Sequence, residues 1–381
     1  MTKLIDITGK AVSGEWGEDD EAGNGIPVLR TTNFTNDGII NYSNVVTRLI
    51  TKKASIDDKF LRKGDIIIEK SGGSDKQPVG RVVFFDGEEN KYLFNNFTGL
   101  LRVKDSTICS PRFLFYALFY NYKKGGTIPF QNKTTGLHNL KTDDYVKRLE
   151  IELLPIEQQL HIVSALDKLQ SIITHRKQQL AKLDELVKAR FVEMFGDPVD
   201  NPLGWDKKQL QEIVSDDCTI SYGIVQTGDD QVEGVPVFRP VDIVNRMPVL
   251  SELKKTTKEI SDRYKRTILR GRELLLTVRA NIADTCIVGE EFAGCNVGRG
   301  IVPLRTKETI VILEFLKYQL DNRHLNDRIK SKAKGITLVQ LNMEDLRLVE
   351  LIVPPIELQK SYVSFAKQTD KSKFVRKDQN R

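Results

Sequence analysis

The feature of this sequence that most constrains its fold is an internal repeat. The segment "IPVLR" (26–30) corresponds to "VPVFR" (235–239), and farther along "LPIEQQ" (154–159) corresponds to "PPIELQ" (354–359). The offset is 209 residues for the first pair and 200 for the second, so the two copies differ in the lengths of their loops. Such a repeat predicts one structural unit used twice. Loops are also where two copies of a scaffold usually diverge in what they bind.

The first part of each unit has the pattern of a mixed domain. Short runs of β-branched and aromatic residues, such as "RVVFFDG" and "TCIVGEEF", are separated by Gly, Asn and Asp, as strands are separated by turns. We expect one short helix in each domain, at residues 110–123 and 308–333. The predicted fold class is α+β, with two similar globular domains at residues 1–153 and 198–353.

The segment between these domains, residues 154–197, has the pattern of one long helix. Pro155 precedes the pattern and Gly196 ends it, which predicts a helix of roughly 60 Å at about 1.5 Å per residue. Its apolar stripe consists of Ile162, Leu166, Leu169, Ile173, Leu180, Leu183 and Val187. A stripe of this kind has to be buried against a partner, and we expect residues 354–381 to form a second helix that packs on the first as a coiled-coil-like spacer. The alternative is that both segments are ordinary core helices of a single fold.

The second helix is shorter than the first and lacks leucine heptads, because 28 residues remain from Pro354 onward. If the pair is antiparallel, we expect its apolar residues to cover only the N-terminal part of the first helix. The stripe from Leu180 to Val187 is then exposed or covered by another chain. The apolar residues in question are Leu358, Tyr362, Phe365 and Ala366.

Composition narrows the classes of partner. The net charge is +6 and basic residues are locally concentrated, nine against five acidic in 48–81 and nine against three in 254–279, which admits nucleic acid as a partner. Four cysteines without a CxxC pair and four scattered histidines indicate neither a disulfide framework nor a metal site. The N-terminus lacks the apolar core of a secretory signal and no window approaches the roughly 18 apolar residues of a membrane span. We expect a cytoplasmic protein without a membrane partner.

The order of these features resembles the specificity subunits of type I restriction-modification systems, over essentially the whole chain. The resemblance rests on "GLHNLKTDDYVKRLEIELLPIEQQ" before the long helix, "MFGDPVDNPLGW" after it, "GITLVQLNMEDLRLVELIVPPIELQ" at the end of the second domain, and "SGGSDKQPVGRVVFF" in the first. It implies two target-recognition domains that bind double-stranded DNA. It also implies that the helical spacer docks methyltransferase subunits, two of them, and restriction subunits. S-adenosylmethionine is expected on the methyltransferase partner, with no cofactor bound directly by this chain.

The resemblance also implies a subunit without catalysis, and the residues agree with that expectation. The chain has no GxxxxGK[ST] loop for ATP and no HxE with CxxC pattern of a zinc deaminase. The "NPLG" at 201–204 is interpreted as a linker turn. An alternative function is a stand-alone DNA-binding repressor or decoy that dimerises with itself through the long helix. An enzyme would require a catalytic cluster that this sequence does not reveal.

Two different target-recognition domains on a helical spacer predict a bipartite, asymmetric DNA target. Its half-sites are expected to lie about one helical turn, roughly 34–36 Å, apart. Polar side chains on glycine-containing loops are the candidates for reading base edges. In the first domain they are Arg30, Thr32, Asn33, Lys70, Ser71, Ser74, Lys76, Gln77, Arg81, Gln131, Asn132 and Lys133. In the second they are Arg239, Arg279, Asn281, Arg299, Lys332 and Lys334. Alternatively, Arg81 and Arg279 pair with structural carboxylates, and several lysines contact phosphate, which positions a protein without specifying sequence.

Overall fold

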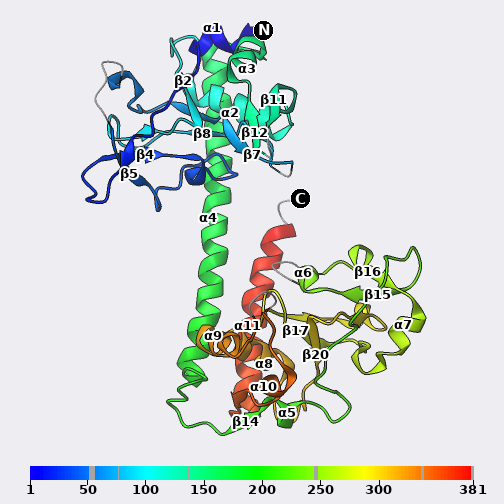
Figure 1. Cartoon of the computed structure of the whole chain (residues 1–381). Coiled ribbons are helices and arrows are strands. Elements are labelled where there is room, and N and C mark those ends of the chain that lie inside the picture. Colours follow the sequence, from blue (N-terminus) through cyan, green and yellow to red (C-terminus); the bar gives the residue numbers. More distant parts are fainter. Residues whose placement is uncertain (51–55, 76, 135–136, 244–247, 336–338, 379–381) are drawn as a thin grey trace. The chain divides into compact units, whose positions relative to one another are not determined.

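A computed structural model describes the chain outside residues 51–55, 76, 135–136, 244–247, 336–338 and 379–381, and also leaves out the side chains of 133–134 and 371–378. Contacts divide the chain into two compact units, unit 1 (Met1–His175) and unit 2 (Arg176–Arg381). The division falls inside the long helix α4 (Ile156–Phe195), so each unit includes one part of that helix (Figure 1). The long helix predicted from the apolar stripe is confirmed.

Unit 1 combines several small sheets with short helices. Its described strands form sheets of order β2-β10-β6-β8, β3-β5-β4-β9 and β11-β12-β7, and β1 pairs with β13. The strands are β1 (Thr2–Lys3), β2 (Val12–Ser13), β3 (Glu18–Asp19), β4 (Ile26–Leu29), β5 (Val46–Leu49), β6 (Ile66–Glu69), β7 (Ser71–Gly73), β8 (Val82–Phe84), β9 (Leu93–Phe94), β10 (Thr98–Leu101), β11 (Gln131–Thr134), β12 (Leu137–Leu140) and β13 (Glu150–Ile151). The helices are α1 (Leu4–Thr8), α2 (Pro111–Lys123) and α3 (Thr142–Arg148), with 3-10 turns at Thr31–Asn33, Asp57–Lys59 and Ile128–Phe130.

Unit 2 has a similar mixture. Its described strands form sheets of order β16-β15-β19 and β18-β17-β20, and β14 pairs with β21. The strands are β14 (Lys207–Gln209), β15 (Val235–Phe238), β16 (Lys254–Thr256), β17 (Glu273–Thr277), β18 (Thr285–Val288), β19 (Asn296–Val297), β20 (Ile301–Leu304) and β21 (Glu350–Ile352). The helices are α5 (Leu210–Ile213), α6 (Pro240–Ile243), α7 (Lys258–Asp262), α8 (Leu313–Leu320), α9 (Arg323–Ser331), α10 (Met343–Arg347) and α11 (Ile356–Asp378), with 3-10 turns at Leu250–Glu252, Lys265–Thr267 and Glu290–Phe292.

The topology confirms the repeat. In unit 1, β4 pairs in parallel with β9, and β6 lies between β8 and β10. In unit 2, β15 pairs in parallel with β19, and β17 lies between β18 and β20. A glycine precedes both arrangements because β9 in unit 1 and β19 in unit 2 pass too close for a side chain. A Cβ on Gly14 would lie 2.1 Å from the carbonyl oxygen of Phe94, and one on Gly223 would lie 1.9 Å from that of Val297.

The helices within the two domains differ in part from the sequence expectation. Residues 110–123 form α2, with the Ser110 hydroxyl accepting from the backbone N–H of Phe113 at the N-cap. The single helix expected at 308–333 is wrong, because α8 and α9 are separate helices. Asn322 separates them, since its side chain accepts from the backbone N–H of His324 (3.0 Å) and thereby starts α9 as an N-cap.

Helix α11 packs on α4 inside unit 2, but not where the sequence analysis expected. Tyr362 is fully buried, donates to the carbonyl of Val187 (3.1 Å), and lies edge-on to Phe191 and Phe195. The C-terminal end of α4 is therefore covered and Val187 is buried, which corrects the expectation that α11 covers the N-terminal part. The physical reason is that the start of a second, antiparallel helix meets the end of the first.

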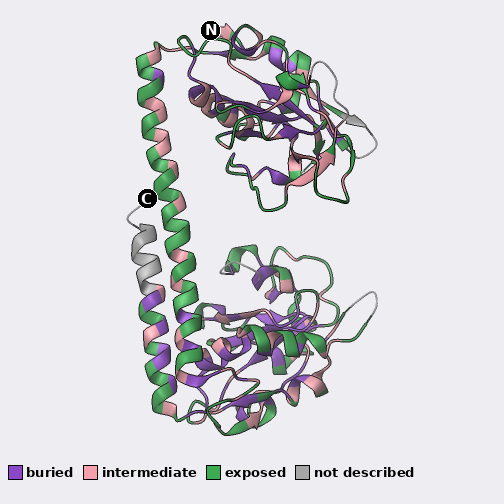
Figure 2. Cartoon of the chain, turned by 90° about the vertical axis from the view of Figure 1, so that its left-hand side faces the viewer, coloured by how far each residue is buried: buried purple, intermediate pink, exposed green. Residues whose placement is uncertain are grey.

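Most of α4 remains accessible to solvent. Figure 2 shows this helix exposed or half-buried over most of its length, and along the predicted stripe Leu169 is 55% and Ile173 is 48% exposed. The side chains of Leu166, Leu180 and Leu183 are half-buried. In the described part of the chain, no helix has the length and apolar character needed to cross a membrane.

The repeated phrase places one buried glutamine at the start of each long helix. The Oε1 atom of Gln159 accepts from the backbone N–H of Ser110 (2.9 Å), and its Nε2 donates to the carbonyls of Ile108 (2.9 Å) and Leu154 (2.7 Å). Gln359 makes the same set of bonds in unit 2, accepting from the N–H of Ile312 (3.0 Å) and donating to Ile310 (3.0 Å) and Pro354 (2.8 Å). The equivalent glutamine in each unit therefore fastens a helix to its domain.

We expect Gln159→Ala to destabilise unit 1 by at least about 2 kcal/mol, because it leaves a buried N–H and two carbonyls without partners. The measurement is urea unfolding of the full chain, with the two units followed by hydrogen exchange. Gln158→Ala is the matched control, since Gln158 is exposed on the same turn of α4. Equal stability of the two variants would contradict the role assigned to Gln159.

Candidate nucleic-acid interface

In unit 1, the sheet β7-β12-β11 brings together two loops that the sequence analysis singled out separately. Ser71 on β7 lies opposite Asn139 on β12, and Gln131 on β11 lies opposite Leu140. His138 joins them, because its Nδ1 lies 3.1 Å from Oε1 of Gln131 and its Nε2 lies 3.5 Å from a carboxylate oxygen of Asp75. Asn132 is exposed on β11, and the Lys133 side chain lies outside the described residues.

A second group of side chains follows three paired strand ends of unit 1, and we call it the unit 1 strand-end cluster: Arg30 after β4, Asn96 and Phe97 after β9, and Lys70 after β6. The backbone N–H of Asn95 donates to Leu29 (2.9 Å) and that of Lys70 donates to Phe97 (2.8 Å), which holds these ends together. Lys70 donates through Nζ to the Ser13 hydroxyl (2.8 Å), and burial lowers the pKa of Lys70 from its ordinary value. The Nε atom of Arg30 is buried and has no hydrogen-bond partner among the described residues.

Two of the predicted residues in unit 1 have their polar groups occupied inside the domain. The Asn33 amide accepts from the N–H of Arg30 (3.0 Å) and donates to the carbonyl of Asn41 (3.0 Å), and its side chain is buried. The Arg81 guanidinium forms a bidentate pair with buried Glu69 (3.0 and 2.9 Å) and also donates to the carbonyls of Phe34 and Thr31. The alternative considered for Arg81, pairing with a structural carboxylate, is the arrangement found.

The remaining candidates of unit 1 lie on turns at its surface. Thr32 is exposed on the 3-10 turn next to Asn33. Ser74 is exposed, and its hydroxyl accepts from the N–H of Gln77 (3.2 Å), which closes a tight turn. The Gln77 amide lies beside the side chain of Asn36. Lys76, within that turn, lies outside the described residues.

The unit 2 strand-end cluster occupies the equivalent place and contains three arginines: Arg239 after β15, Arg299 after β19, and Arg279 after β17. The N–H of Gly298 donates to Phe238 (2.8 Å) and that of Val278 donates to Gly300 (2.8 Å), so the same three strand ends are joined as in unit 1. Arg239 is held by a bidentate pair with buried Asp242 (3.0 and 2.9 Å). Arg299 is exposed, and its guanidinium has no partner among the residues that the structure describes.

The other candidates of unit 2 lie around this cluster and on α9. Asn281 is exposed on the loop between β17 and β18, where Ala280 and Ala283 both have positive φ (59° and 65°), a conformation that costs free energy for residues other than glycine. Lys334 is exposed and exchanges two backbone hydrogen bonds with Gln340 (3.0 and 2.9 Å). Lys332 follows the end of α9 and lines a separate hollow with Gln209 and Arg328, so the structure does not join it to the cluster.

Sequence reasoning missed several polar residues that the fold brings to these sites. Asn96 occupies the position of Arg299, and Asn139 the position of Gln340, in the two copies. An alignment of "NNFTG" (95–99) with "GRGIV" (298–302) would have found the first, and one of "HNLKTDD" (138–144) with "VQLNMED" (339–345) the second. His138, which contacts Gln131, and Tyr222, whose hydroxyl accepts from the Gln340 amide, gave no signal in the sequence, because these contacts exist only in the folded chain.

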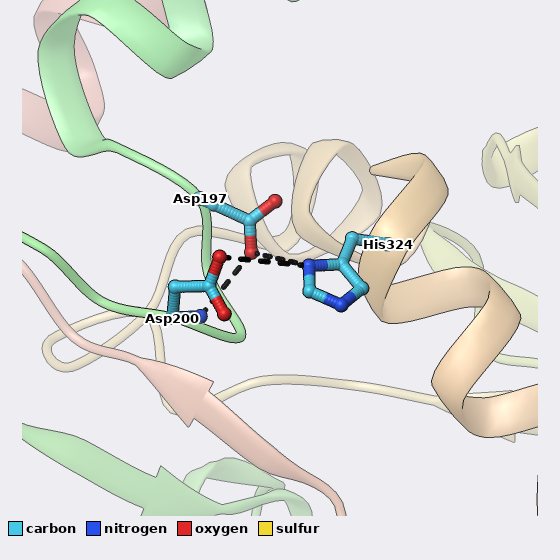
Figure 3. Close-up of side chains that lie close together, drawn as sticks. All are labelled: Asp197, Asp200 and His324. Atoms are coloured by element: carbon cyan, nitrogen blue, oxygen red, sulfur yellow. Dashed lines mark hydrogen bonds and ion pairs between the residues drawn. The ribbon is translucent and has the colours of Figure 1, made fainter.

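Figure 3 shows a further group that the sequence did not indicate, formed by Asp197, Asp200 and His324. The Nδ1 atom of His324 lies 3.1 Å from Oδ1 of Asp197 and 3.9 Å from Oδ2 of Asp200. The same Asp197 oxygen accepts from the backbone N–H of Val199 (2.8 Å). These contacts fasten the segment after α4 to the start of α9, and we assign the group a structural role.

Two α+β domains of one topology, with different polar side chains on the same strand ends, define a class of tandem recognition proteins. Residues 3–185 and 202–380 match the family described as "Type I restriction modification DNA specificity domain", and the chain belongs to this family. It is 23% identical over 316 residues to the type I restriction enzyme EcoBI specificity subunit of Escherichia coli, an alignment that covers 76% of this chain and 66% of that protein. The chain thus spans just under two thirds of the length of this relative.

Two solved structures have the same fold. One is the type I restriction-modification S subunit from M. genitalium, with a TM-score of 0.54, 15% identity, and coverage of 99% of this chain and 90% of that one. The other comes from a structure of complex assembly and conformational transition in the type I R-M system, with a TM-score of 0.54, 18% identity, and coverage of 99% and 91%. The family membership and fold expected from the sequence are therefore confirmed.

We expect Arg81→Ala to unfold unit 1 at lower denaturant, with a loss of about 3–5 kcal/mol, because it leaves the buried Glu69 carboxylate unpaired. The measurement is denaturant unfolding followed by far-UV circular dichroism. Arg62→Ala is the control, since Arg62 is exposed. A folded, equally stable Arg81→Ala protein would instead indicate that this arginine is available for a ligand.

Proposed function

We propose that this chain is a sequence-specific DNA-binding subunit that recognises a bipartite, asymmetric target in double-stranded DNA. The observation that carries the proposal is the repetition of one framework with different polar side chains at its strand ends. Unit 1 presents Arg30 and Asn96 there, with Ser71 at the position that Arg279 holds in unit 2, whereas unit 2 presents Arg239, Arg299 and Arg279. Two frameworks of the same shape that carry different donors and acceptors are suited to two different half-sites.

The side chains most suited to reading bases are those left accessible by the fold. In unit 1 they are Thr32, Ser71, Ser74, Gln77, Gln131 and Asn132, together with Asn96, Asn139 and the cluster residues Arg30 and Lys70. In unit 2 they are Arg239, Arg279, Asn281, Arg299 and Lys334. Asn33 and Arg81 are assigned to the framework, because their polar groups are already satisfied within unit 1. Lys332 is assigned to phosphate contact or to solvent.

The second part of the proposal concerns the long helix. The exposed apolar residues Leu169, Ile172 and Ile173 are spaced so that they share one face of α4. An exposed apolar face on a helix is suited to a protein partner. We propose that it docks two methyltransferase subunits per chain, which bind S-adenosylmethionine and catalyse methylation. We propose that restriction subunits dock there too and catalyse cleavage. The chain itself is proposed to be non-catalytic and to act in the cytoplasm, where its DNA lies.

We expect the chain, produced together with the methyltransferase subunits of its host, to direct adenine methylation to one split, asymmetric motif. The measurement is methylation-sensitive sequencing of genomic DNA with and without this chain. Loss of that motif on deletion supports the proposal. An unchanged methylation pattern, together with a stable self-dimer of the purified chain, would indicate the stand-alone repressor or decoy.

We expect the double variant Leu169→Glu, Ile173→Glu to lose at least tenfold in affinity for the methyltransferase subunits, because two charges would be buried in the contact. Binding is measured by co-purification and by titration calorimetry. Lys168→Glu is the control for added negative charge on an exposed neighbouring position. Undiminished binding by the double variant, with wild-type stability, would place the docking surface elsewhere.

A further inference from the structure

A chain of hydrogen bonds in unit 2 controls the orientation of Arg279. The backbone of Arg279 forms an isolated bridge with Gln340, and its Nε donates to the Oε1 atom of Gln340. The Nε2 atom of Gln340 donates to the Tyr222 hydroxyl oxygen, and that hydroxyl donates to the carbonyl of Leu341 (3.2 Å). Three side chains from segments far apart in the sequence are therefore linked.

The direction of every bond in this chain is fixed by its two ends. A carbonyl can only accept, so the Tyr222 hydroxyl must donate to Leu341 and is left to accept from Gln340. Gln340 then turns its amide nitrogen toward Tyr222 and its oxygen toward Arg279, whose guanidinium can only donate. Because none of these groups can exchange its role as donor or acceptor, the linked hydrogen bonds hold the Arg279 guanidinium in one orientation.

The terminal nitrogens of Arg279 are left for a ligand. They have no hydrogen-bond partner among the described residues, and the side chain is partly exposed. The neighbouring strand end carries Gly300, at which an added Cβ would lie 3.5 Å from the Cβ of Arg279 and 2.6 Å from Cγ of Pro240. Gly300 is buried, and the absence of a side chain there lets Pro240 and Arg279 pack closely against this strand end.

We propose that Arg279 reads a guanine in the half-site bound by unit 2, and that Gln340 and Tyr222 are its positioning residues. This inference rests on the proposed DNA-binding function. An arginine whose two terminal nitrogens have no partner in the protein can match the O6 and N7 acceptors of guanine in the major groove with two parallel hydrogen bonds. Holding Nε in advance reduces the number of side-chain conformations that are lost on binding.

The equivalent place in unit 1 is built differently. There Ser71 and Asn139 lie opposite each other, as Arg279 and Gln340 do in unit 2. Serine lacks the two-pronged donor that guanine recognition uses, so this position in unit 1 is not expected to select guanine. The same backbone position therefore contributes to the asymmetry of the target.

The test uses the full chain produced with its methyltransferase subunits and a pool of DNA duplexes with randomised cores, from which bound sequences are selected and read. We expect the wild type to select a guanine at one position of one half-site. Arg279→Ala and Arg279→Lys each reduce the preference for that guanine by about tenfold or more, since alanine removes the contact and lysine lacks the rigid two-pronged donor of a guanidinium. Tyr222→Phe reduces the preference at the same position only and by less, and the other half-site is unchanged throughout.

Arg323→Ala is the control, because Arg323 is an almost fully exposed arginine on α9. If Arg279→Ala weakens binding to all duplexes equally while the selected motif is retained, Arg279 contacts phosphate and the inference is wrong. Arg279→Lys keeps the positive charge, so it decides the question even where the alanine variant is poorly folded. A wild-type complex that selects no split motif would overturn the proposed function together with this inference. If the wild type selects a split motif and the Arg279 variants select the same motif unchanged, the inference alone is wrong.

Discussion

The rest of the structure depends on how a helix is attached to a small domain, and a buried glutamine makes that attachment in each unit. Gln159 and Gln359 each satisfy one backbone N–H and two backbone carbonyls that no regular element pairs. An amide side chain is suited to this place because it offers an acceptor and two donors at once. Farther along α4, Asp167 accepts from Arg112 (2.9 Å) on α2, which adds a second link between the helix and unit 1.

Within each domain, a buried ion pair stabilises the same arrangement of strands in both units. Asp65 pairs with Arg102 (2.7 Å) after β10, and Glu273 pairs with Arg305 (3.1 Å) after β20. Each carboxylate also accepts from the backbone N–H three residues before it, Arg62 for Asp65 and Arg270 for Glu273. Because both the charge and the turn depend on this group, the framework tolerates little change here. Variation is concentrated instead at the strand ends, where side chains face solvent.

The sequence predicted the type of residue that forms the candidate site, but not which particular residues belong to it. Glycine-rich loops with basic residues indicated Arg239, Arg279 and Arg299, and the fold brings all three to neighbouring strand ends. The sequence could not separate these from Arg81, which has the same residue type and the same loop setting. The difference is Glu69, a buried carboxylate twelve residues away that occupies the Arg81 guanidinium. Likewise, nothing local in the sequence distinguishes Asn33, whose amide is used within its own turn, from an amide that faces solvent.

The sequence by itself determined the repeat, the α+β class, the long helix and the family. Hydrophobic periodicity, helix-ending residues and repeated segments are all visible along the sequence without knowledge of tertiary contacts. Tertiary structure alone decided which polar groups are already satisfied, since that depends on partners brought together across strands. It also decided the place where α11 covers α4, because the burial of Val187 under Tyr362 depends on the direction in which the two helices run. The Arg279–Gln340–Tyr222 chain has the same origin, as its members lie more than fifty residues apart and meet only when β17 and the segment around Gln340 pair.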